Sequence, residues 1–383
     1  MKTGDEITIS ASELVAGGDA LARVDGFPVF ASNVFPGDVA VVRLYEVKKG
    51  YAKADMVRLV EASPWRRAEP CPIAHECGGC DWTALRLDKQ LEAKRRILTE
   101  SLRRIGKFDP GSLPSVAIHP SPLNYRIRSR LQSDGRAIGF YAMRSNRVVP
   151  LTTQCEVVGR ATADTFGTES ESGAGEKKAR AGSPALHQIW EIDDELIAGP
   201  GELTLRVDKY SWRLSTRSFF QVNRHMHAAL IRLVEGHAAR RAGKRSAVDL
   251  YAGVGFFTLP LAKHFKQVIA VEGSAESAGY ARMNVPANVQ VIEAPVEVHA
   301  CRLAKADFVF LDPPRAGARP EVIAAAGEKA SEMVCYLSCD PVTFARDAHR
   351  LSASGWRLAT LDLLDLFPNT HHVETLASFE RAR

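Results

Sequence analysis

The residue with the clearest capacity for covalent chemistry is Cys339, in the stretch VCYLSCDPVTFARD. The apolar run that ends at this cysteine is typical of a buried strand, and Asp340-Pro341 follows it as at the start of a helix. A thiol at the carboxyl end of a strand, facing a positively charged crevice, shifts toward the thiolate and becomes a nucleophile. Cys335, inside the run, is expected in the core.

Two further motifs place polar groups at the ends of apolar runs. FVFLDPPRAG offers Asp312 on a loop stiffened by two prolines. DLYAGVGFFTLPLA contains the turn Asp249-x-x-x-Gly253-x-Gly255, and Glu272 follows about twenty residues later, where an acid accepts the hydroxyls of a ribose. Together the two motifs predict a nucleoside cofactor site. Taken alone, the glycine motif could be a tight turn without a ligand, and the two prolines could merely terminate a strand.

Glu374 is a candidate base near the C-terminus, in LFPNTHHVETLASFERAR. It follows two histidines and begins an apolar, strand-like run. An isolated acid at such a position is more often a surface residue. Its assignment to chemistry therefore depends on the motif around it.

Three of the seven cysteines, Cys71, Cys77 and Cys80, lie within ten residues in CPIAHECGGC. The C-x5-C-x2-C spacing differs from the paired spacing of most structural zinc sites and needs a fourth ligand. Cys155 is the nearest remaining cysteine in sequence and the best candidate. An iron–sulfur cluster is the preferred interpretation, and a zinc site or unligated thiols are the alternatives.

Composition places the chain among globular proteins of two or three domains. It has 383 residues, 45% of them hydrophobic, and no run of eighteen apolar residues. The N-terminal stretch MKTGDEITIS lacks the layout of a signal peptide, so a cytoplasmic protein without membrane contact is expected. Cysteines are normally reduced in the cytosol, which favours metal binding or catalysis as the reason for a cluster of them.

Basic residues are concentrated in one segment. The whole chain carries a net charge of +5, whereas residues 81–130 hold eleven Lys or Arg against five acids, an excess of six. Such a local field suits a polyanion such as RNA, and the alternative is a solvated helix face. Within NYRIRSRLQ, strand-like alternation would place Arg126, Arg128 and Arg130 on one side, where they could contact phosphates.

The hydrophobic periodicity differs between parts of the chain. Residues 1–62 alternate between apolar and polar with glycine turns, which predicts a small closed β-barrel of the OB type. Trp82 to Ile105 follows a helical pattern, and residues 168–184 read as a mobile loop. From about residue 222, apolar strands alternate with helices, the pattern of an α/β protein with a parallel doubly wound sheet.

Taken together, these motifs resemble the RNA uracil-5-methyltransferase family, in particular the branch that carries a [4Fe-4S] cluster and methylates 23S rRNA. The resemblance extends over nearly the whole chain and includes SFFQVN at 218–223, DPPRAG, SCDP and FPNTHHVE. It implies a TRAM-like barrel at 1–62, a central RNA-binding iron–sulfur α+β domain at 63–215, and a Rossmann-like S-adenosylmethionine-dependent methyltransferase domain at 216–383.

The resemblance also implies roles for residues. Cys339 would attack C6 of the target uracil, C5 would take the methyl group of S-adenosylmethionine, and Glu374 would remove the C5 proton. The family's remaining positions fall on the cofactor residues Gln221, Tyr251, Glu272 and Asp312 and on the cluster ligands Cys71, Cys77, Cys80 and Cys155. The implied partner is RNA, most simply 23S rRNA, and the implied state is a monomer.

The chain departs from the family pattern at two places. Phe256 stands where the family usually has Asn, and Ala294-Pro295 stands where a polar residue usually contacts the adenine, so weaker cofactor affinity is expected. Three alternatives remain: a tRNA uracil-5-methyltransferase, a non-catalytic metal-stabilised RNA-binding protein, and an amino-directed methyltransferase. The last usually has an aromatic residue after Pro-Pro, and here that place is taken by Arg315.

Overall fold

A computed structural model describes residues 1–168, 187–240 and 245–382. The chain forms two compact units that alternate along the sequence. The barrel unit comprises Met1–Ile97, Arg130–His187 and Phe367–His372, and the sheet unit comprises Leu98–Ser129, Gln188–Leu366 and Val373–Arg383. The loop predicted at 168–184 lies outside the described residues except for Thr168, which forms a β-bridge with Thr152.

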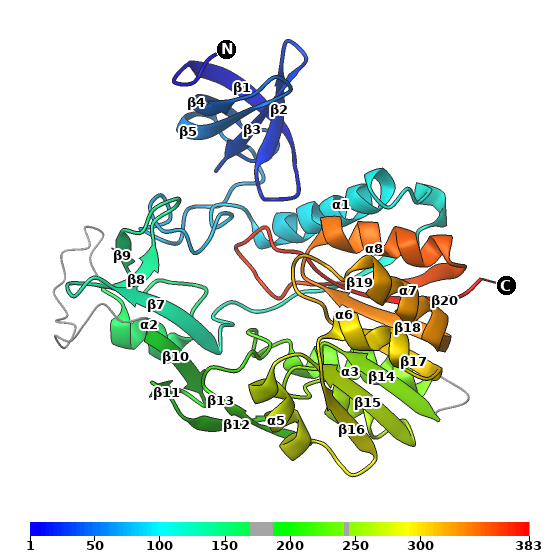
Figure 1. The fold of residues 1–383 in the computed structure, drawn as a ribbon. Coiled ribbons are helices and arrows are strands. Elements are labelled where there is room, and N and C mark those ends of the chain that lie inside the picture. Colours follow the sequence, from blue (N-terminus) through cyan, green and yellow to red (C-terminus); the bar gives the residue numbers. More distant parts are fainter. Residues whose placement is uncertain (169–186, 241–244, 383) are drawn as a thin grey trace. The chain divides into compact units, whose positions relative to one another are not determined.

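The first five strands form a closed barrel in the order β1-β2-β3-β5-β4 (Figure 1). They are β1 (Glu6–Leu14), β2 (Ala20–Val24), β3 (Phe27–Ser32), β4 (Val39–Val47) and β5 (Ala52–Glu61). Alternate side chains such as Ile9, Val29 and Val42 point into the interior and are at most 2% exposed. The prediction of a small closed barrel is confirmed.

Asp38 connects the barrel to the segment that follows it. The carboxylate is fully buried, and its Oδ1 and Oδ2 accept hydrogen bonds from Nε and Nη2 of Arg66 at 2.9 and 2.8 Å. It also accepts the backbone N–H groups of Phe35 and Ser63 at 2.7 and 2.8 Å. Four charge-assisted bonds therefore compensate the burial of this acid.

The helix predicted from Trp82 begins five residues later, as α1 (Leu87–Arg104). Trp82 is instead fully buried in the turn before it, and its Nε1 donates to the carbonyl of Gly18 at 3.0 Å. Leu98 and Leu102 of the helix are buried, whereas Leu87 at its start and Ile105 just beyond its end are exposed. The remaining elements of the barrel unit and its borders are β7 (Arg128–Ser133), β8 (Ile138–Tyr141), β9 (Val148–Pro150) and α2 (Arg160–Phe166).

The sheet unit is built on an eight-stranded sheet in the order β16-β15-β14-β17-β18-β20-β19-β6 (Figure 1). Its strands are β6 (Val116–His119), β14 (Ser246–Leu250), β15 (Gln267–Glu272), β16 (Val289–Glu293), β17 (Ala306–Leu311), β18 (Ala330–Ser338), β19 (Trp356–Leu364) and β20 (Glu374–Arg381). β14 to β18 are parallel, while β20 runs antiparallel to both neighbours. The prediction of an α/β doubly wound sheet is confirmed.

Helices connect the parallel strands, as expected for right-handed crossovers. They are α3 (His227–Ala239), α4 (Thr258–Leu261), α5 (Ala275–Asn284), α6 (Val296–His299), α7 (Pro320–Lys329) and α8 (Pro341–Ala353), with 3-10 turns η1 (Pro110–Ser112) and η2 (Ala300–Arg302). Two hairpins precede the sheet: β10 (His187–Ile192) with β11 (Glu195–Ala198), and β12 (Glu202–Val207) with β13 (Tyr210–Ser215). Among the described residues, none of these helices has the length and apolar character needed to cross a membrane.

The buried pair of Asp38 and Arg66 gives a stability prediction. D38N should lower the free energy of unfolding by about 3 kcal/mol, because it leaves the Arg66 guanidinium without its charged partner. E6Q is the matched control, since Glu6 pairs with Arg43 on the surface at 2.6 Å and such pairs contribute less than about 1 kcal/mol. Urea unfolding of the full chain measures both, and equal losses in the two variants would contradict the assignment.

Candidate active site and cysteine segment

Strands β14 and β17 bring two predicted residues to one edge of the sheet. They pair in parallel with Leu250 opposite Leu311, so Tyr251 and Asp312 each follow the last residue of a neighbouring strand. The N–H of Asp312 donates to the carbonyl of Leu250 at 3.3 Å, which continues the pairing one residue further. Ligands of open α/β sheets bind at this carboxyl edge.

The glycine turn after β14 is tied to the end of β15 by Glu272. Its Oε2 accepts the N–H of Gly253 at 2.8 Å and its Oε1 accepts the N–H of Ser274 at 2.7 Å. Tyr251 has a left-handed φ of 66° before the turn, and its hydroxyl donates to Oε1 of Glu297 at 3.1 Å. The turn therefore exposes backbone beside a carboxylate, the arrangement expected for a nucleoside site.

Cys339 and Glu374 meet across the antiparallel pair β18 and β20. Ser338 lies opposite Thr375 in this pair. Cys339 follows Ser338 and Glu374 precedes Thr375, so the register places the thiol opposite the carboxyl group. Glu374 is only 4% exposed, and its charge is a main influence on the pKa of Cys339.

The prediction that a positively charged crevice lowers the pKa of Cys339 is wrong. Burial raises the pKa of this thiol to about 12, and the carboxyl groups of Glu374 and Asp312 add to the increase. Arg315 acts in the opposite direction but is outweighed. The shift therefore favours the protonated thiol at neutral pH in this structure.

Three carboxyl groups near this edge have raised pKa values, and burial is the largest cause in each. Burial, followed by the charge of Asp249, raises the pKa of Asp312 to about 8. Burial also raises the pKa of Asp249 to about 7, and Thr258 donates a short hydrogen bond to it. Burial and the charge of Asp312 raise the pKa of Glu374 well above its ordinary value. Carboxyl groups with raised pKa values are typical of sites that transfer protons.

Gln221 completes the group, because its Nε2 donates to Oδ2 of Asp312 at 3.2 Å. Two residues that the sequence analysis did not single out hold it in place. The imidazole Nε2 of His227 lies 2.6 Å from the carbonyl of Gln221, and burial lowers the pKa of His227 to about 4, so this histidine is neutral. Asn223 is fully buried and donates to the carbonyl of Leu366 at 2.9 Å. Asn223 is the last residue of the SFFQVN motif, and the only sequence signal for His227 is its proximity to that motif.

Phe256, the departure in the glycine turn, belongs to an aromatic cluster. Its ring centroid lies 4.9 Å from that of Phe220, 5.2 Å from Trp212 and 5.8 Å from His227. The side chain is 6% exposed. Phe256 thus packs the turn against the SFFQVN segment, and the expected loss of cofactor affinity remains a prediction.

The four candidate ligand cysteines all belong to the barrel unit. Cys71 and Cys77 pack against the small cluster of Ile73, Ala142 and Val149, and the N–H of Gly79 donates to Sγ of Cys77 at 3.4 Å. The charges of Cys155 and Cys77 add to burial in raising the pKa of Cys71 to about 12. These contacts gather the thiols in one region.

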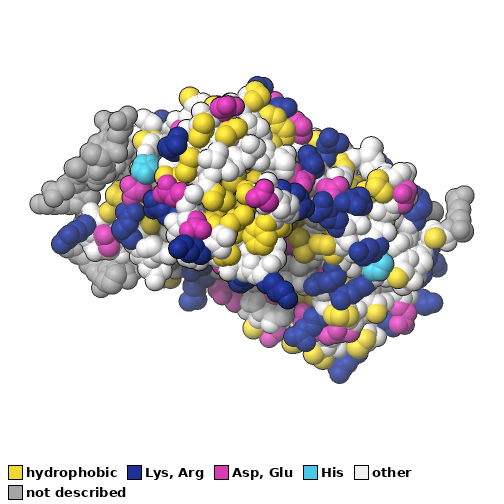
Figure 2. Space-filling model, turned by 90° about the horizontal axis from the view of Figure 1, so that it is seen from above, with side chains coloured by type: hydrophobic (Ala, Val, Ile, Leu, Met, Phe, Trp, Pro, Cys, Tyr) yellow, Lys and Arg dark blue, Asp and Glu magenta, His cyan; other side chains and the backbone are white. Residues whose placement is uncertain are grey.

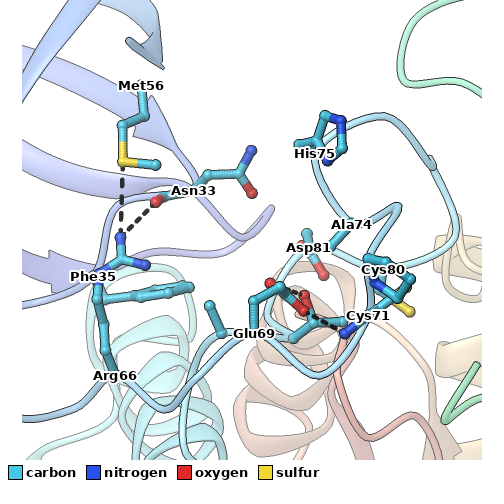
Figure 3. A pocket seen from close by; sticks show the side chains of 13 residues that line it. Asn33, Phe35, Met56, Arg66, Glu69, Cys71, Ala74, His75, Cys80 and Asp81 are labelled. Carbon is cyan, nitrogen blue, oxygen red and sulfur yellow. Dashed lines mark hydrogen bonds between the residues drawn. The ribbon is translucent and has the colours of Figure 1, made fainter. Parts of the chain in front are cut away.

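Cys71 and Cys80 line a pocket of about 300 Å³ together with Glu69, Asp81 and Arg66 (Figure 3). Four thiols are a donor set that suits an iron–sulfur cluster or a zinc ion. In the described ranges, however, no three His, Cys, Asp or Glu side chains are arranged closely enough to hold a metal ion. The donor chemistry fits the predicted cluster, while its geometry is not formed.

The raised pKa of Asp312 predicts how stability depends on pH. The folded protein keeps this proton up to about pH 8, whereas an unfolded aspartate releases it near pH 4. The stabilising contribution of the proton is therefore complete below about pH 4 and is lost as the pH rises to about 8.

D312N cannot lose that proton and should gain stability relative to the native protein between about pH 5 and pH 8. We expect a gain of about 1–2 kcal/mol, because Asp312 keeps partial solvent exposure. Urea unfolding at both pH values measures it. A stability difference that does not change with pH would contradict the buried protonated carboxyl group.

Comparison with family models identifies both parts of the chain. The model described as tRNA (Uracil-5-)-methyltransferase matches residues 190–308 and 297–382. The model of the TRAM domain matches residues 2–57. The two matches correspond to most of the sheet unit and to the barrel.

Relatives of similar length extend this likeness over the whole chain. An uncharacterized RNA methyltransferase of Gloeobacter violaceus is 30% identical, with 99% of this chain and 97% of the relative covered. The 23S rRNA (uracil(1939)-C(5))-methyltransferase RlmD of Shewanella sp. (strain W3-18-1) is also 30% identical, with 98% and 96% covered.

Among solved structures, the tRNA (uracil-54, C5)-methyltransferase of Pyrococcus abyssi in complex with S-adenosyl-L-homocysteine superposes with a TM-score of 0.72. It is 24% identical, and the match covers 97% of this chain and 99% of that structure. The fold is therefore shared from end to end. With Cys339, Glu374 and Asp312 gathered at one sheet edge and a TRAM barrel before them, the chain belongs to the RNA uracil-5-methyltransferase family.

Proposed function

We propose that this protein methylates C5 of one uracil in 23S rRNA through a covalent bond between Cys339 and C6 of the base. The observation that supports the proposal is the register of β18 and β20, which sets Cys339 opposite Glu374 beside Asp312. A nucleophile and a carboxylate on one side of a planar base are what addition and elimination at C5–C6 require.

In the proposed reaction, the thiolate of Cys339 adds to C6, and the electrons of the C5–C6 double bond move onto C5 and O4. C5 would then bond to the methyl carbon supplied by S-adenosylmethionine, while the methyl–sulfur bond breaks and its electrons stay on the sulfur of a neutral thioether product. The carboxylate of Glu374 accepts the C5 proton, the electrons of the C5–H bond restore the double bond, and the C6–S bond breaks to release the thiolate. Because its pKa is raised, Glu374 is protonated in the free protein and must first release its own proton; the carboxylate that results is a stronger proton acceptor than an ordinary one.

S-adenosylmethionine supplies the methyl group when it is bound. We assign its binding to the residues at the edge of β14, β15 and β17, namely Gln221, Tyr251, Glu272 and Asp312. Glu272 already accepts two backbone N–H groups and retains lone pairs for ribose hydroxyls. Asp312 and Gln221 are hydrogen-bonded to each other and lie near Cys339, so they would also read the uracil edge.

RNA binding is supported by the basic surface, although part of the predicted charge is used internally. Figure 2 shows Lys and Arg side chains gathered on the viewed face, with acidic groups among them. Arg103 and Arg104 pair with Glu100, and buried Lys94 donates to a backbone carbonyl. Arg128 donates to the carbonyl of Ser218, whereas Arg130 is exposed. The phosphate contacts would therefore come from the exposed arginines, with the target base turned out of its stack.

Cys71, Cys77, Cys80 and Cys155 would hold the proposed [4Fe-4S] cluster. Their common location and all-thiol donor set support the assignment. No acceptor chemistry beside them calls for electrons, so the cluster would act structurally and order the segment that contacts RNA. The division into domains at 1–62, 63–215 and 216–383, the monomeric state and the cytoplasmic location remain our predictions.

The choice of rRNA over tRNA rests on the likeness to the Shewanella 23S rRNA enzyme, at 30% identity over 98% of this chain. The likeness to the archaeal tRNA enzyme, at 24% identity, concerns the fold alone. Mapping of 5-methyluridine at nucleotide resolution in cells with and without the gene would decide between them. Loss of one 23S rRNA site is the expected result. Loss of a tRNA site would favour the tRNA alternative, and no loss would favour a non-catalytic RNA-binding protein.

Trapping with 5-fluorouridine RNA tests the covalent step, because fluorine cannot be removed as a cation and the adduct persists. The native protein with S-adenosylmethionine should form a complex that survives denaturing electrophoresis. C339A should form none. E374Q should accumulate an adduct on ordinary uridine RNA, where the native enzyme turns over. Absence of both adducts would remove Cys339 and Glu374 from these roles.

Metal analysis tests the cysteine assignment. C155S should lose most of its iron and acid-labile sulfide after anaerobic purification, because a cluster with three ligands is held less firmly. C301S is the matched control, since Cys301 is exposed and belongs to the sheet unit. Full iron and sulfide content in C155S would show that the fourth ligand lies elsewhere. Stoichiometric zinc in the native protein would show that the cysteines form a zinc site and not an iron–sulfur cluster.

A further inference from the structure

Asn369 is the most heavily hydrogen-bonded residue of the loop Phe367–His372, which we call the base loop because Glu374 follows it. The side chain is fully buried. Its Oδ1 accepts from Arg67 and from Nε2 of Gln90, both at 3.0 Å, and its Nδ2 donates to Oε2 of Glu156 at 2.9 Å. Every one of these partners lies in the barrel unit, as Asn369 itself does.

The backbone of Asn369 is held as firmly as its side chain. Its N–H donates to Oε1 of Gln90 at 2.8 Å, and its carbonyl accepts the N–H groups of Asp81 and Trp82 at 3.2 and 3.0 Å. The residue has a left-handed φ of 66°, which Asn tolerates better than most residues. One side chain and one strained backbone position thus fix the middle of the base loop.

Both ends of the base loop are anchored in the same unit. The ammonium of Lys94, fully buried, donates to the carbonyl of Phe367 at 2.9 Å. The N–H of His371 donates to Oδ1 of Asp81 at 3.0 Å, and the His371 ring forms a second, short hydrogen bond to Oδ2. The loop is therefore restrained at its start, its middle and its end.

The chain passes from His371 through His372 and Val373 to Glu374 with no spare length. Glu374 is two residues beyond the loop, so its Cα lies within about 7 Å of the Cα of His372. Val373 is 1% exposed and cannot take up slack by moving into solvent. Because only this short stretch of chain joins the base loop to Glu374, we expect a displacement of the loop to alter the position of the Glu374 carboxyl group.

Two of the anchors are direct neighbours of candidate ligand cysteines. Asp81 follows Cys80, and Glu156 follows Cys155. Glu156 accepts from both Asn369 and Arg67, the latter at 2.6 Å, which joins the Cys155 segment to the base loop through one carboxylate. The order of the cysteine segment and the order of the base loop are thus coupled by hydrogen bonds.

We propose that Asn369 is a positioning residue that sets the place of Glu374, and that Asp81 and Glu156 make this placement depend on the order of the cysteine segment. The proposal rests on the proposed function, in which Glu374 removes the C5 proton after methyl transfer. It assigns a consequence to the cysteine site: loss of its order slows the release of methylated RNA more than it slows attack by Cys339.

The first test separates attack from elimination with N369G, which accepts the left-handed φ and removes only the side-chain bonds. Turnover on uridine RNA should fall about 10- to 100-fold, because small misplacements of a catalytic group have effects of that size. A covalent adduct should accumulate on the same RNA, while the rate of trapping by 5-fluorouridine RNA stays within about twofold of native. K94M, which removes the bond to Phe367 together with the cation–π contact of the Lys94 ammonium with the Trp82 ring, should change the same quantities in the same direction and by less.

N288A is the matched control, because Asn288 also fixes a loop through two bonds to backbone carbonyls, those of Ala262 and Phe265. It should leave turnover, adduct and trapping unchanged. A parallel fall of turnover and 5-fluorouridine trapping in both N369G and K94M would assign the network to folding or RNA binding and overturn the proposal. Failure of E374Q to accumulate adduct would instead overturn the proposed function.

The second test follows the coupling without any measure of activity. Hydrogen exchange of peptides that contain Asn369 and His371 should accelerate in C155S and C80S, because the N–H groups of both residues donate to anchored side chains. C301S should leave this exchange unchanged. Native-like protection of the base loop in C155S that has lost its iron would show that the cysteine segment and the loop are independent.

Discussion

The antiparallel strand β20 is the constraint on which the site depends. It lies between β18 and β19, so the chain returns through the sheet after its last parallel strand and brings Glu374 back to the edge where Cys339 ends β18. The two groups are 35 residues apart in sequence and could not meet on a single loop without that return. The pairing of β18 with β20 fixes the position of Cys339 relative to Glu374 through backbone hydrogen bonds. Substitutions of surface side chains do not disturb these bonds.

This arrangement concentrates acids where a thiol must ionise. Asp249, Asp312 and Glu374 are buried close together, and their mutual repulsion and desolvation favour the protonated forms. Burial is also the largest cause of the raised pKa of Cys339, and the carboxyl groups of Glu374 and Asp312 add to it. In the proposed reaction, a cationic sulfonium ligand bound at this edge would lower the pKa values of the acidic groups there and so favour ionisation of Cys339.

The sequence was sufficient to predict the barrel and the α/β sheet because the signals for both were local. Apolar runs that end in Asp312, Glu272 and Cys339 predicted strand ends, and the carboxyl edge of a parallel sheet gathers such residues whatever the loop lengths. Glycine turns between alternating apolar and polar stretches predicted the barrel, and these are also local signals. Trp82 was misplaced because its apolar periodicity matches a helix, while the hydrogen bond from its indole to Gly18 favours a turn.

The electrostatics of Cys339 could not be predicted in the same way. The carboxyl groups that influence the pKa of Cys339 belong to Glu374 and Asp312. Their proximity to Cys339 depends on the register of β20 and on the strand order of the sheet, and a local sequence pattern predicts neither. Asn369 was missed for a related reason. Its partners Arg67, Gln90 and Glu156 are more than 200 residues away in sequence, and an Asn between Pro and Thr reads only as a turn residue.

The supports of Cys339 and Glu374 differ, and for that reason we propose that the steps assigned to them can be lost separately. Cys339 is held by β18 and by the start of α8, where Asp340 caps the helix by accepting the N–H groups of Val342 and Thr343. Glu374 is held by β20 and by the base loop, whose anchors belong to the barrel unit. Since the anchors of one group can loosen while those of the other stay intact, the geometry for elimination can be lost while the geometry for attack is retained. An enzyme with a single shared support would lose both together.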